Sequence, residues 1–388
     1  MKAIANFGLR VADYRPEQFD FEQLPAGHGV FLLETNGAPY LSKSVNLRRR
    51  VARLLGTEGG LSKRLNLGAT AHAIRYKLTG SAFESSVLLY RLARQLFPHD
   101  YRVRLRLRPF WLLKLNLENE FPRCYLTRRL RPGPSLYFGP FPRRSAAERF
   151  ASDFLDLFKS RRCAEDLHPH PAHPGCIYGE MGMCLRPCQA AVSRQAYLEE
   201  VARVGEFLST QGGSLVRVLE AERDRASAEL NFEEAARLHK RLEKVEAVLQ
   251  APELAQRGGL ATDLERLHGV VIQRSAEAQA VVLFPVYRAF LLPQVTFSLA
   301  PDPETGKPVS LDARLREVLL TNSQPPSPNP RLRAEHLALL ARWFYRGTRQ
   351  GEFVGFDNFE QPPFRRLVNA IARVARGLEQ GSESSPVL

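Results

Sequence analysis

The stretch GVFLLETNGAPYLSKSVNLRRRV, residues 29–51, indicates most clearly how this chain folds. Its first six residues are an apolar run of strand length, and the Asn-Gly pair that follows favours a tight turn between antiparallel strands. A second strand over 39–42 would complete a hairpin. Residues 46–55 then place apolar side chains at helical spacing among arginines, with Ser44 or Asn46 as the candidate N-cap. The pattern predicts two paired strands followed by an arginine-bearing helix.

Positive charge is concentrated in the first part of the chain. The 388 residues carry a formal net charge of +14, while residues 41–150 alone hold 23 Lys and Arg against 6 Asp and Glu. Such a field attracts polyanions, and nucleic acid is the commonest of these in a cell, although a basic solubilising surface is the alternative. The segment YRVRLRLR, residues 101–108, alternates apolar and basic residues and predicts one strand. Its expected polar face consists of Arg102, Arg104, Arg106 and Arg108.

The composition is that of a globular protein with several domains. Hydrophobic residues make up 44% and charged residues 25% of a chain long enough for two to four domains. No apolar run approaches the roughly 20 residues that span a bilayer, and the N-terminus lacks the features of a signal peptide. We therefore expect a cytoplasmic protein of mixed α/β (α+β) class that does not contact a membrane.

Four of the five cysteines are close together in the sequence, with the spacing C-x12-C-x7-C-x3-C. They are Cys163, Cys176, Cys184 and Cys188. Four thiolates suit either a tetrahedral Zn²⁺ or a [4Fe–4S] cluster, and the spacing does not choose between them. His168, His170 and His173 lie between the first two cysteines as competing zinc ligands. The remaining thiol, Cys124, is expected to be a small buried core residue.

Residues 195–250 are strongly helical in pattern. Asn231 is a good N-cap with Glu234 three residues later, as in a capping box. One apolar stripe follows, formed by Ala235, Leu238, Leu242, Val245 and Leu249. A preceding helix at about 213–229 could fold back as an antiparallel partner. The element is either an ordinary packed helix pair or a docking surface for another protein.

Several of these motifs together resemble one protein family. The GVF and YLSK segments, with Asn46, Leu47 and Arg50 after them, resemble the GIY-YIG nuclease signature in the form found in UvrC, an excinuclease subunit. YFGPF at 137–141 and the cysteine segment resemble further UvrC motifs. LNFEEAARL resembles the UVR motif, through which UvrC and the helicase subunit UvrB associate. The resemblance covers roughly residues 20–300 in the family's own order.

This resemblance implies roles for individual residues. In such nucleases a tyrosine activates water, an arginine stabilises the phosphate and a glutamate holds a divalent metal such as Mg²⁺ or Mn²⁺. The catalytic positions fall on Tyr40 and Arg50, with Lys43 as a second cation. The residues expected to contact DNA are Arg48, Arg49, Arg53, Arg102, Arg104 and Arg106. Those expected to contact a UvrB-type partner are Phe232, Glu233, Ala236 and Leu238, and the four clustered cysteines would hold an iron–sulfur cluster.

The nuclease signature is incomplete at its most important position. The metal-binding glutamate falls on Leu89, which offers no oxygen ligand to Mg²⁺ or Mn²⁺. Glu84 lies five residues earlier on the same predicted helix, about 140° away around its axis, and cannot take that place. The first-motif tyrosine is Phe31, and the glycine after Tyr40-Leu41 is Ser42. We therefore expect this site to hold a DNA backbone and its endonuclease activity to be impaired.

The expected organisation has four parts and ends before the ribonuclease H-like half of UvrC. They are a degenerate GIY-YIG domain with a small mixed sheet and helices at 20–105, a connector and four-cysteine segment at 106–192, a UVR-like hairpin at 195–250 and a small C-terminal α/β region at 262–380. Three functions compete for this organisation. They are a non-cleaving repair protein that binds DNA and UvrB, an active nuclease that makes a single incision near lesions, and a regulatory competitor for UvrB.

Overall fold

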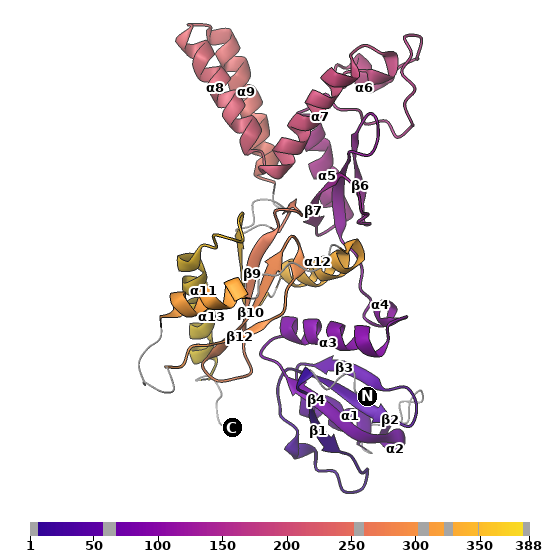
Figure 1. The fold of residues 1–388 in the computed structure, drawn as a ribbon, viewed down its shortest axis with the longest axis vertical. Coiled ribbons are helices and arrows are strands. Elements are labelled where there is room, and N and C mark those ends of the chain that lie inside the picture. The colour runs from indigo at the N-terminus through magenta and orange to yellow at the C-terminus, as the bar shows by residue number, and fades with distance from the viewer. Residues whose placement is uncertain are drawn as a thin grey trace.

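The computed structural model describes residues 7–56, 67–251, 260–301, 310–321, 329–347 and 349–382. Three antiparallel sheets with flanking helices follow one another along an elongated molecule (Figure 1). The N-terminal sheet lies at one end, a two-helix hairpin lies at the other, and the C-terminal sheet lies between them. This architecture confirms the expected mixed α/β class. In the parts of the chain just named, no helix has the length and apolar character needed to cross a bilayer.

The N-terminal sheet has the strand order β1-β4-β2-β3. Its elements are β1 (Arg10–Asp13), β2 (Gly29–Thr35), β3 (Tyr40–Ser44), β4 (Ala71–Leu78), α1 (Leu47–Leu55), α2 (Leu67–Thr70) and α3 (Ala82–Leu96). The hairpin and helix lie where the opening stretch predicts them, and Asn46 caps α1 by accepting the Arg49 N–H at 2.9 Å. The expectation of a mixed sheet is wrong, because every pairing among the described strands of this sheet is antiparallel, including that of the unpredicted edge strand β1.

Side chains alternate across the N-terminal sheet, so its two faces carry separate apolar clusters. Phe31 and Leu33 of β2 pack in the cluster that includes α1. Val30 and Leu32, which point the other way, pack against α3. Because β2 is buried on both faces, its sequence is apolar from Gly29 to Leu33, without the alternation of a half-exposed strand.

The middle sheet has the strand order β6-β5-β7-β8. Its elements are β5 (Trp111–Asn116), β6 (Arg123–Thr127), β7 (Ser135–Phe141), α5 (Arg144–Leu155) and β8 (Thr262–Asp263). Phenylalanines fill the space between this sheet and α5. The Phe150 ring stacks on Phe138 and Phe154, with ring centroids 5.1 and 5.6 Å apart. The cysteine segment follows α5 and contains the short helix α6 (Ile177–Glu180).

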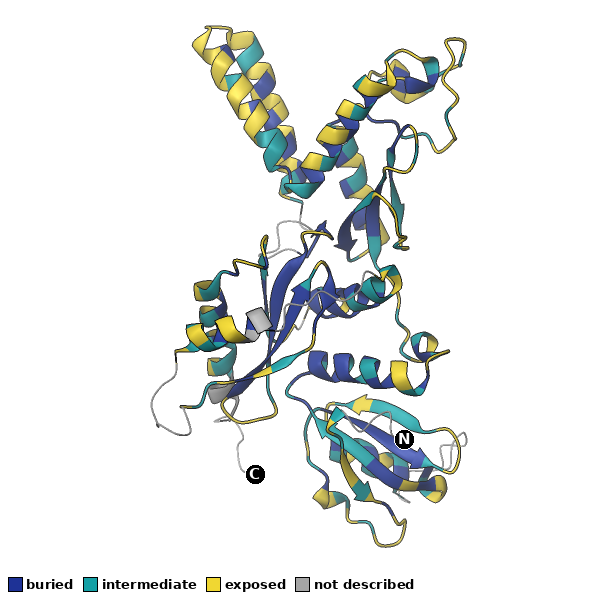
Figure 2. Ribbon diagram, in the orientation of Figure 1, coloured by how far each residue is buried: buried dark blue, intermediate teal, exposed yellow. Residues whose placement is uncertain are grey.

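Three helices follow the cysteine segment, namely α7 (Arg194–Ser209), α8 (Gly213–Ala228) and α9 (Phe232–Leu249). The α8–α9 pair forms the expected antiparallel hairpin and projects from the rest of the molecule (Figure 1). Asn231 caps α9 as predicted, because its side chain accepts the Glu234 N–H at 3.2 Å. Figure 2 shows that much of the outer surface of the hairpin is exposed.

The C-terminal sheet has the order β11-β10-β9-β13, with β12 also paired to β10. Its elements are β9 (His268–Arg274), β10 (Ala280–Tyr287), β11 (Phe290–Leu291), β12 (Val295–Ser298), α11 (Leu311–Thr321), α12 (Pro330–Phe344), β13 (Glu352–Phe356) and α13 (Phe364–Ser382). One face of the sheet packs against α11 and α13 through Leu315 and Leu367. The other face packs against α12 through Leu340 and Phe344.

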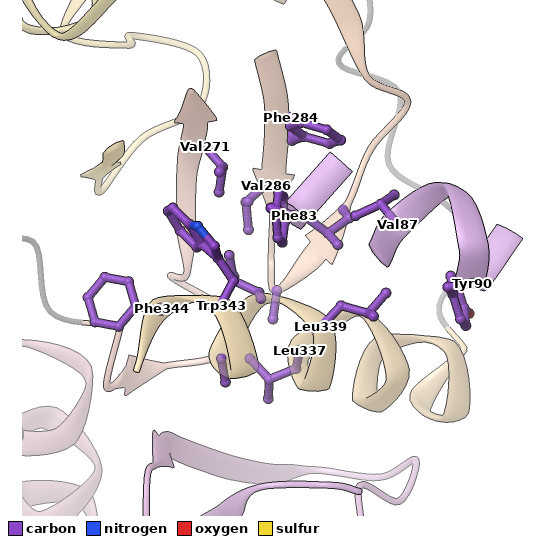
Figure 3. Packing of buried hydrophobic residues seen from close by; sticks show 14 of the residues in the cluster. Phe83, Val87, Tyr90, Val271, Phe284, Val286, Leu337, Leu339, Trp343 and Phe344 are labelled. Atoms are coloured by element: carbon purple, nitrogen blue, oxygen red, sulfur yellow. The ribbon is translucent and has the colours of Figure 1, made fainter. Parts of the chain in front are cut away.

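Helix α3 joins the N-terminal sheet to this C-terminal core. Figure 3 shows Phe83 and Val87 of α3 beside Phe284 and Trp343. The Phe83 ring lies 5.0 Å from Phe284 and 5.1 Å from Trp343, measured between ring centroids. The first and last parts of the chain therefore share one apolar core.

Residues 101–108 do not form the strand that their alternating sequence predicts. Helix α4 (Tyr101–Arg104) occupies the first half, and Arg106 has a left-handed backbone with φ 49°. Val103, expected in a core, is 80% exposed. The proposed row of arginines on one strand face is therefore wrong.

A carboxylate far away in the sequence explains this difference. Glu335 of α12 is 6% exposed, and its oxygens accept hydrogen bonds from the hydroxyls of Tyr90 and Tyr101, each at 2.7 Å. Arg102 Nε donates to the same carboxylate at 2.5 Å. Burial and the neighbouring Glu335 both raise the pKa of Tyr90. The three donors fix α3 and α4 against α12. With Tyr101 and Arg102 held in this way, residues 101–108 cannot form an extended strand.

Candidate nucleic-acid interface and nuclease-like site

The three predicted catalytic residues do not meet at one point of the N-terminal sheet. Tyr40 lies on the face that carries α1, with its ring centroid 6.2 Å from that of Phe31. Arg50 belongs to α1 and lies on this same side. Lys43 follows Tyr40 by three residues, an odd spacing that directs it to the other side of a strand. Its ammonium donates a hydrogen bond to Ser86 of α3 at 2.5 Å, which separates Lys43 from the other two residues.

The expected metal-ligand position is apolar in its surroundings as well as in its own side chain. Leu89 packs with Leu41 and Leu92 in the cluster between β2 and α3. Glu84 is occupied elsewhere, since its carboxylate accepts the Gly80 N–H at 2.8 Å and the Gln294 amide at 3.3 Å. Burial raises the pKa of Glu84. Leu89 therefore offers no oxygen ligand, and the carboxylate of Glu84 is already hydrogen-bonded elsewhere. The face that carries Tyr40 receives a free carboxylate from neither residue.

Arginine side chains on α1 remain available to an anion. Arg49, Arg50 and Arg53 make no side-chain hydrogen bond or ion pair with any residue in the described ranges. Arg48 differs, because it pairs with Glu22 and donates to a backbone carbonyl. Three of these four cations can thus bind phosphate without first breaking an internal contact.

The arginines of the connector are less available than the sequence suggests. Arg102 is bound to Glu335, and Arg104 pairs with Asp100 at 2.6 Å. The backbone carbonyl of Arg106 accepts a hydrogen bond from Arg342, while its own side chain is exposed. Arg102 and Arg104 are therefore engaged in ion pairs within the protein. Of the three arginines, only Arg106 has a side chain that forms no ion pair with a described residue.

Two cations near Lys43 were missed by the sequence analysis. The charges of Arg346 and Arg342 lower the pKa of Lys43, after a larger contribution from partial desolvation of its ammonium group. Both arginines are exposed and flank the buried residues Trp343 and Phe344 at the end of α12. Arg342 lies on α12 and Arg346 lies just beyond its end, on either side of the apolar pair. This placement of basic residues around buried ones was the signal that could have identified them.

The four clustered cysteines lie in one region of the structure. Cys184 and Cys188 are buried, and Cys163 and Cys176 are half-buried. Burial raises the pKa of Cys163 and Cys184, and Cys176 and Cys188 raise both further. Among the residues that the structure describes, however, no three His, Cys, Asp or Glu side chains converge closely enough to ligate a metal.

The donor chemistry of this group still suits a metal centre. Four thiols with mutual electrostatic repulsion are the set that a cation would stabilise as thiolates. His170 and His173 are less suited, because the Nδ1 atom of each already accepts a backbone N–H, from Ala172 and Gly175 respectively. Cys124 is buried in the middle core, outside this group, as expected.

The tip of the α8–α9 hairpin carries exposed apolar side chains. Phe232 is 66% exposed and Leu230 is 72% exposed. Glu233 and Ala236 are also exposed. Leu238 is buried in the hairpin core, where it packs the two helices together, and its expected contact with a partner stays a prediction.

Two protein-family models match the chain. The model of the UvrC/Cho excinuclease middle domain matches residues 110–207, which run from the start of β5 nearly to the end of α7. The model of the UvrB/uvrC motif matches residues 213–248, which form the α8–α9 hairpin. No solved structure matches the chain.

Curated relatives named UvrABC system protein C extend this similarity. The protein from Moorella thermoacetica is 30% identical over 265 residues, which are 68% of this chain and 42% of the relative. That from Carboxydothermus hydrogenoformans is 28% identical over 78% of this chain and 48% of the relative. That from Methanothermobacter thermautotrophicus is 26% identical over 90% and 58%. The chain spans about half the length of the curated relatives it matches. These matches place the chain in the UvrC family, as a relative that carries the middle domain and the UVR motif.

Proposed function

We propose that this protein binds DNA and a UvrB-type helicase subunit in nucleotide-excision repair, and that its own nuclease site is impaired. The observation that carries the proposal is a contrast within the N-terminal sheet. Arg49, Arg50 and Arg53 are free to bind phosphate, whereas the metal-ligand position is Leu89 in an apolar cluster. Phosphate binding needs only positioned cations, but metal-assisted hydrolysis also needs oxygen ligands for the metal.

The proposed role uses the chain's own residues in a simple way. The α1 guanidinium groups would donate to phosphate oxygens and fix the position of a duplex without reading its sequence. The strong basic excess of residues 41–150 would raise the association rate with DNA. We propose that this takes place in the cytoplasm. The direct test is to measure binding and nicking of the same lesion-bearing duplex.

An active GIY-YIG-type endonuclease that makes a single incision is the second candidate. It is favoured by the placement of Tyr40 and Arg50 on one side of the N-terminal sheet. In this function Tyr40 would activate water and Arg50 would stabilise the charge on the phosphate. A carboxylate from outside the Leu89 position would have to hold Mg²⁺ or Mn²⁺. We rank this function second because Leu89 and Glu84 are both engaged in other contacts.

The four cysteines would hold a [4Fe–4S] cluster or a zinc ion in this proposal. When bound, the group would supply structural cross-linking among Cys163, Cys176, Cys184 and Cys188. The segment around them needs such a cross-link, because Ile177 and Met181 are more than 60% exposed and contribute little to a core.

Phe232→Ala is expected to weaken binding of a UvrB-type partner by about 2 kcal/mol, or roughly 30-fold. The reason is that an exposed aromatic side chain at a hairpin tip is a suitable anchor for a partner surface. Titration calorimetry with the purified partner would measure the change. The matched control is Val11→Ala, which truncates a half-exposed apolar residue on the N-terminal sheet. Equal affinities for the two variants would contradict the assigned role of Phe232.

A regulatory competitor for UvrB is the third candidate, and it depends on the same exposed hairpin tip. This function needs the partner contact but not the α1 arginines. It would be favoured if the protein bound the partner tightly but bound DNA no better than a neutral protein of similar size.

A further inference from the structure

Basic side chains from three separate segments meet beside the junction of α3 and α12. Lys43 of β3 reaches α3, where its ammonium donates to Ser86. The same helix packs on Trp343 through Phe83, three residues before Ser86, so Lys43 and the last turn of α12 contact α3 within one helical turn of each other. On that turn, Arg342 donates to the backbone carbonyl of Arg106 at 2.6 Å, two residues before Arg108 in the sequence.

Buried neighbours fix the backbone that carries each of these cations. Leu107 and Phe110 pack against the shared apolar core on either side of Arg108. The Phe110 ring lies 6.2 Å from the Tyr345 ring. Trp343 and Phe344 are buried in the same core, between Arg342 of α12 and Arg346 just beyond the end of that helix. The backbone that carries these cations is therefore fixed by packing, and only their charged side chains are free to move.

The charges of this group are not compensated. Within the described ranges, no carboxylate forms an ion pair with Lys43, Arg108, Arg342 or Arg346. Burial is the largest cause that lowers the pKa of Arg342 and of Lys43. Repulsion between the cations lowers both further, from Arg108 on Arg342 and from Arg346 and Arg342 on Lys43. Elsewhere exposed arginines commonly find an acidic partner, as Arg373 does with Glu352. A group of like charges destabilises the free protein, and a bound polyanion would relieve that repulsion.

We propose that Lys43, Arg108, Arg342 and Arg346 form a second phosphate-binding surface that holds the backbone of duplex DNA across the junction of the N-terminal and C-terminal sheets. This inference rests on the proposed DNA-binding function and adds a site on the opposite side of the sheet from α1. An extended polyanion suits the group better than a small anion does. The reason is that the exposed cations are spread over two segments. Arg108 lies more than 200 residues before Arg342 and Arg346 in the sequence, and all three are exposed.

Arg342→Gln combined with Arg346→Gln is expected to reduce duplex affinity by about 10-fold near physiological salt and to lower the slope of log K against log [salt] by about 2. The matched control is Arg365→Gln with Arg366→Gln. Both control residues are exposed on α13, on the opposite face of the C-terminal sheet, and the double substitution removes the same net charge. Fluorescence anisotropy with a labelled duplex at several KCl concentrations would measure both quantities. Urea unfolding would verify that each variant is folded.

The outcomes separate this inference from the proposed function. A loss confined to the Arg342/Arg346 variant supports the surface. Equal losses in both variants would show that only net charge matters and would overturn it. If the wild type binds DNA and the Arg342/Arg346 variant binds equally well, the surface is wrong while the proposed function stands. If the wild type does not bind DNA at all, both are wrong.

Discussion

Replacing Glu335 with alanine is expected to lower the free energy of unfolding of the core shared by α3, α12 and the C-terminal sheet by about 3–5 kcal/mol. The buried carboxylate accepts hydrogen bonds from Tyr90, Tyr101 and Arg102. Its removal leaves two hydroxyl groups and a guanidinium without their acceptor. The two tryptophans of the chain allow a selective measurement, because Trp343 lies in this core while Trp111 packs against the middle one. Urea unfolding followed by Trp343 fluorescence in a Trp111→Phe background would report the loss.

A surface carboxylate supplies the control for this experiment. Glu352 pairs with Arg373, and the two side chains are 30% and 54% exposed. Its replacement by alanine should cost less than about 1 kcal/mol, since exposed ion pairs contribute little. If Glu335→Ala and Glu352→Ala shift the unfolding midpoint equally, Glu335 does not clamp the two parts of the chain together.

Cys184→Ser is expected to abolish stoichiometric metal binding and to open residues 160–190 to trypsin. Cys184 is buried, and after burial the other three cysteines of the group raise its pKa further, so its substitution removes one of the four thiol ligands without exposing a new surface. A structural metal held by four side chains can contribute as much as about 10–16 kcal/mol to folding of its segment. Analysis of iron and zinc content after anaerobic purification, together with limited proteolysis, would measure both effects. Visible absorption would distinguish an iron–sulfur cluster from colourless zinc.

The fifth cysteine provides a matched control within the same chain. Cys124 is as buried as Cys184, but it lies in the middle core. Cys124→Ala should therefore keep the metal content of the wild type. The proposed centre would be refuted if Cys184→Ser retained that content as well, or if the wild type carried no metal after anaerobic purification.

Local features of the fold could be predicted from the sequence because local signals determine them. The Asn-Gly turn places β2 and β3, and the side chains of Asn46 and Asn231 cap α1 and α9 where expected. Leu238, Leu242 and Val245 of the apolar stripe of α9 are buried, in a cluster that includes Leu219 and Ala226 of α8. In each case the turn, the cap or the helical period acts over a few residues, so no distant partner is needed.

The fold predictions that were wrong concern segments whose structure depends on residues far away in the sequence. Residues 101–108 have the alternation of a strand, but Glu335, more than 200 residues away, binds Tyr101 and Arg102 and favours a helical turn. Strand β1 carries mainly exposed side chains and forms only because β4 offers it an edge. The separation of Lys43 from Tyr40 could have been predicted, because an odd spacing along a strand places two side chains on opposite faces. The apolar packing of Leu89 could not, since it requires the arrangement of α3 on the sheet.

Nicking of a lesion-bearing duplex by the purified protein is the most direct test of the central claim that the chain binds DNA but has an impaired nuclease site. The reaction would contain a UvrB-type partner, ATP and Mn²⁺, and would compare the wild type with Tyr40→Phe while DNA binding is measured on the same samples. We predict tight, salt-sensitive DNA binding by both proteins and no cleavage by either. Cleavage by the wild type that Tyr40→Phe abolishes would contradict the account, because it would mean that a carboxylate outside the Leu89 position holds the metal.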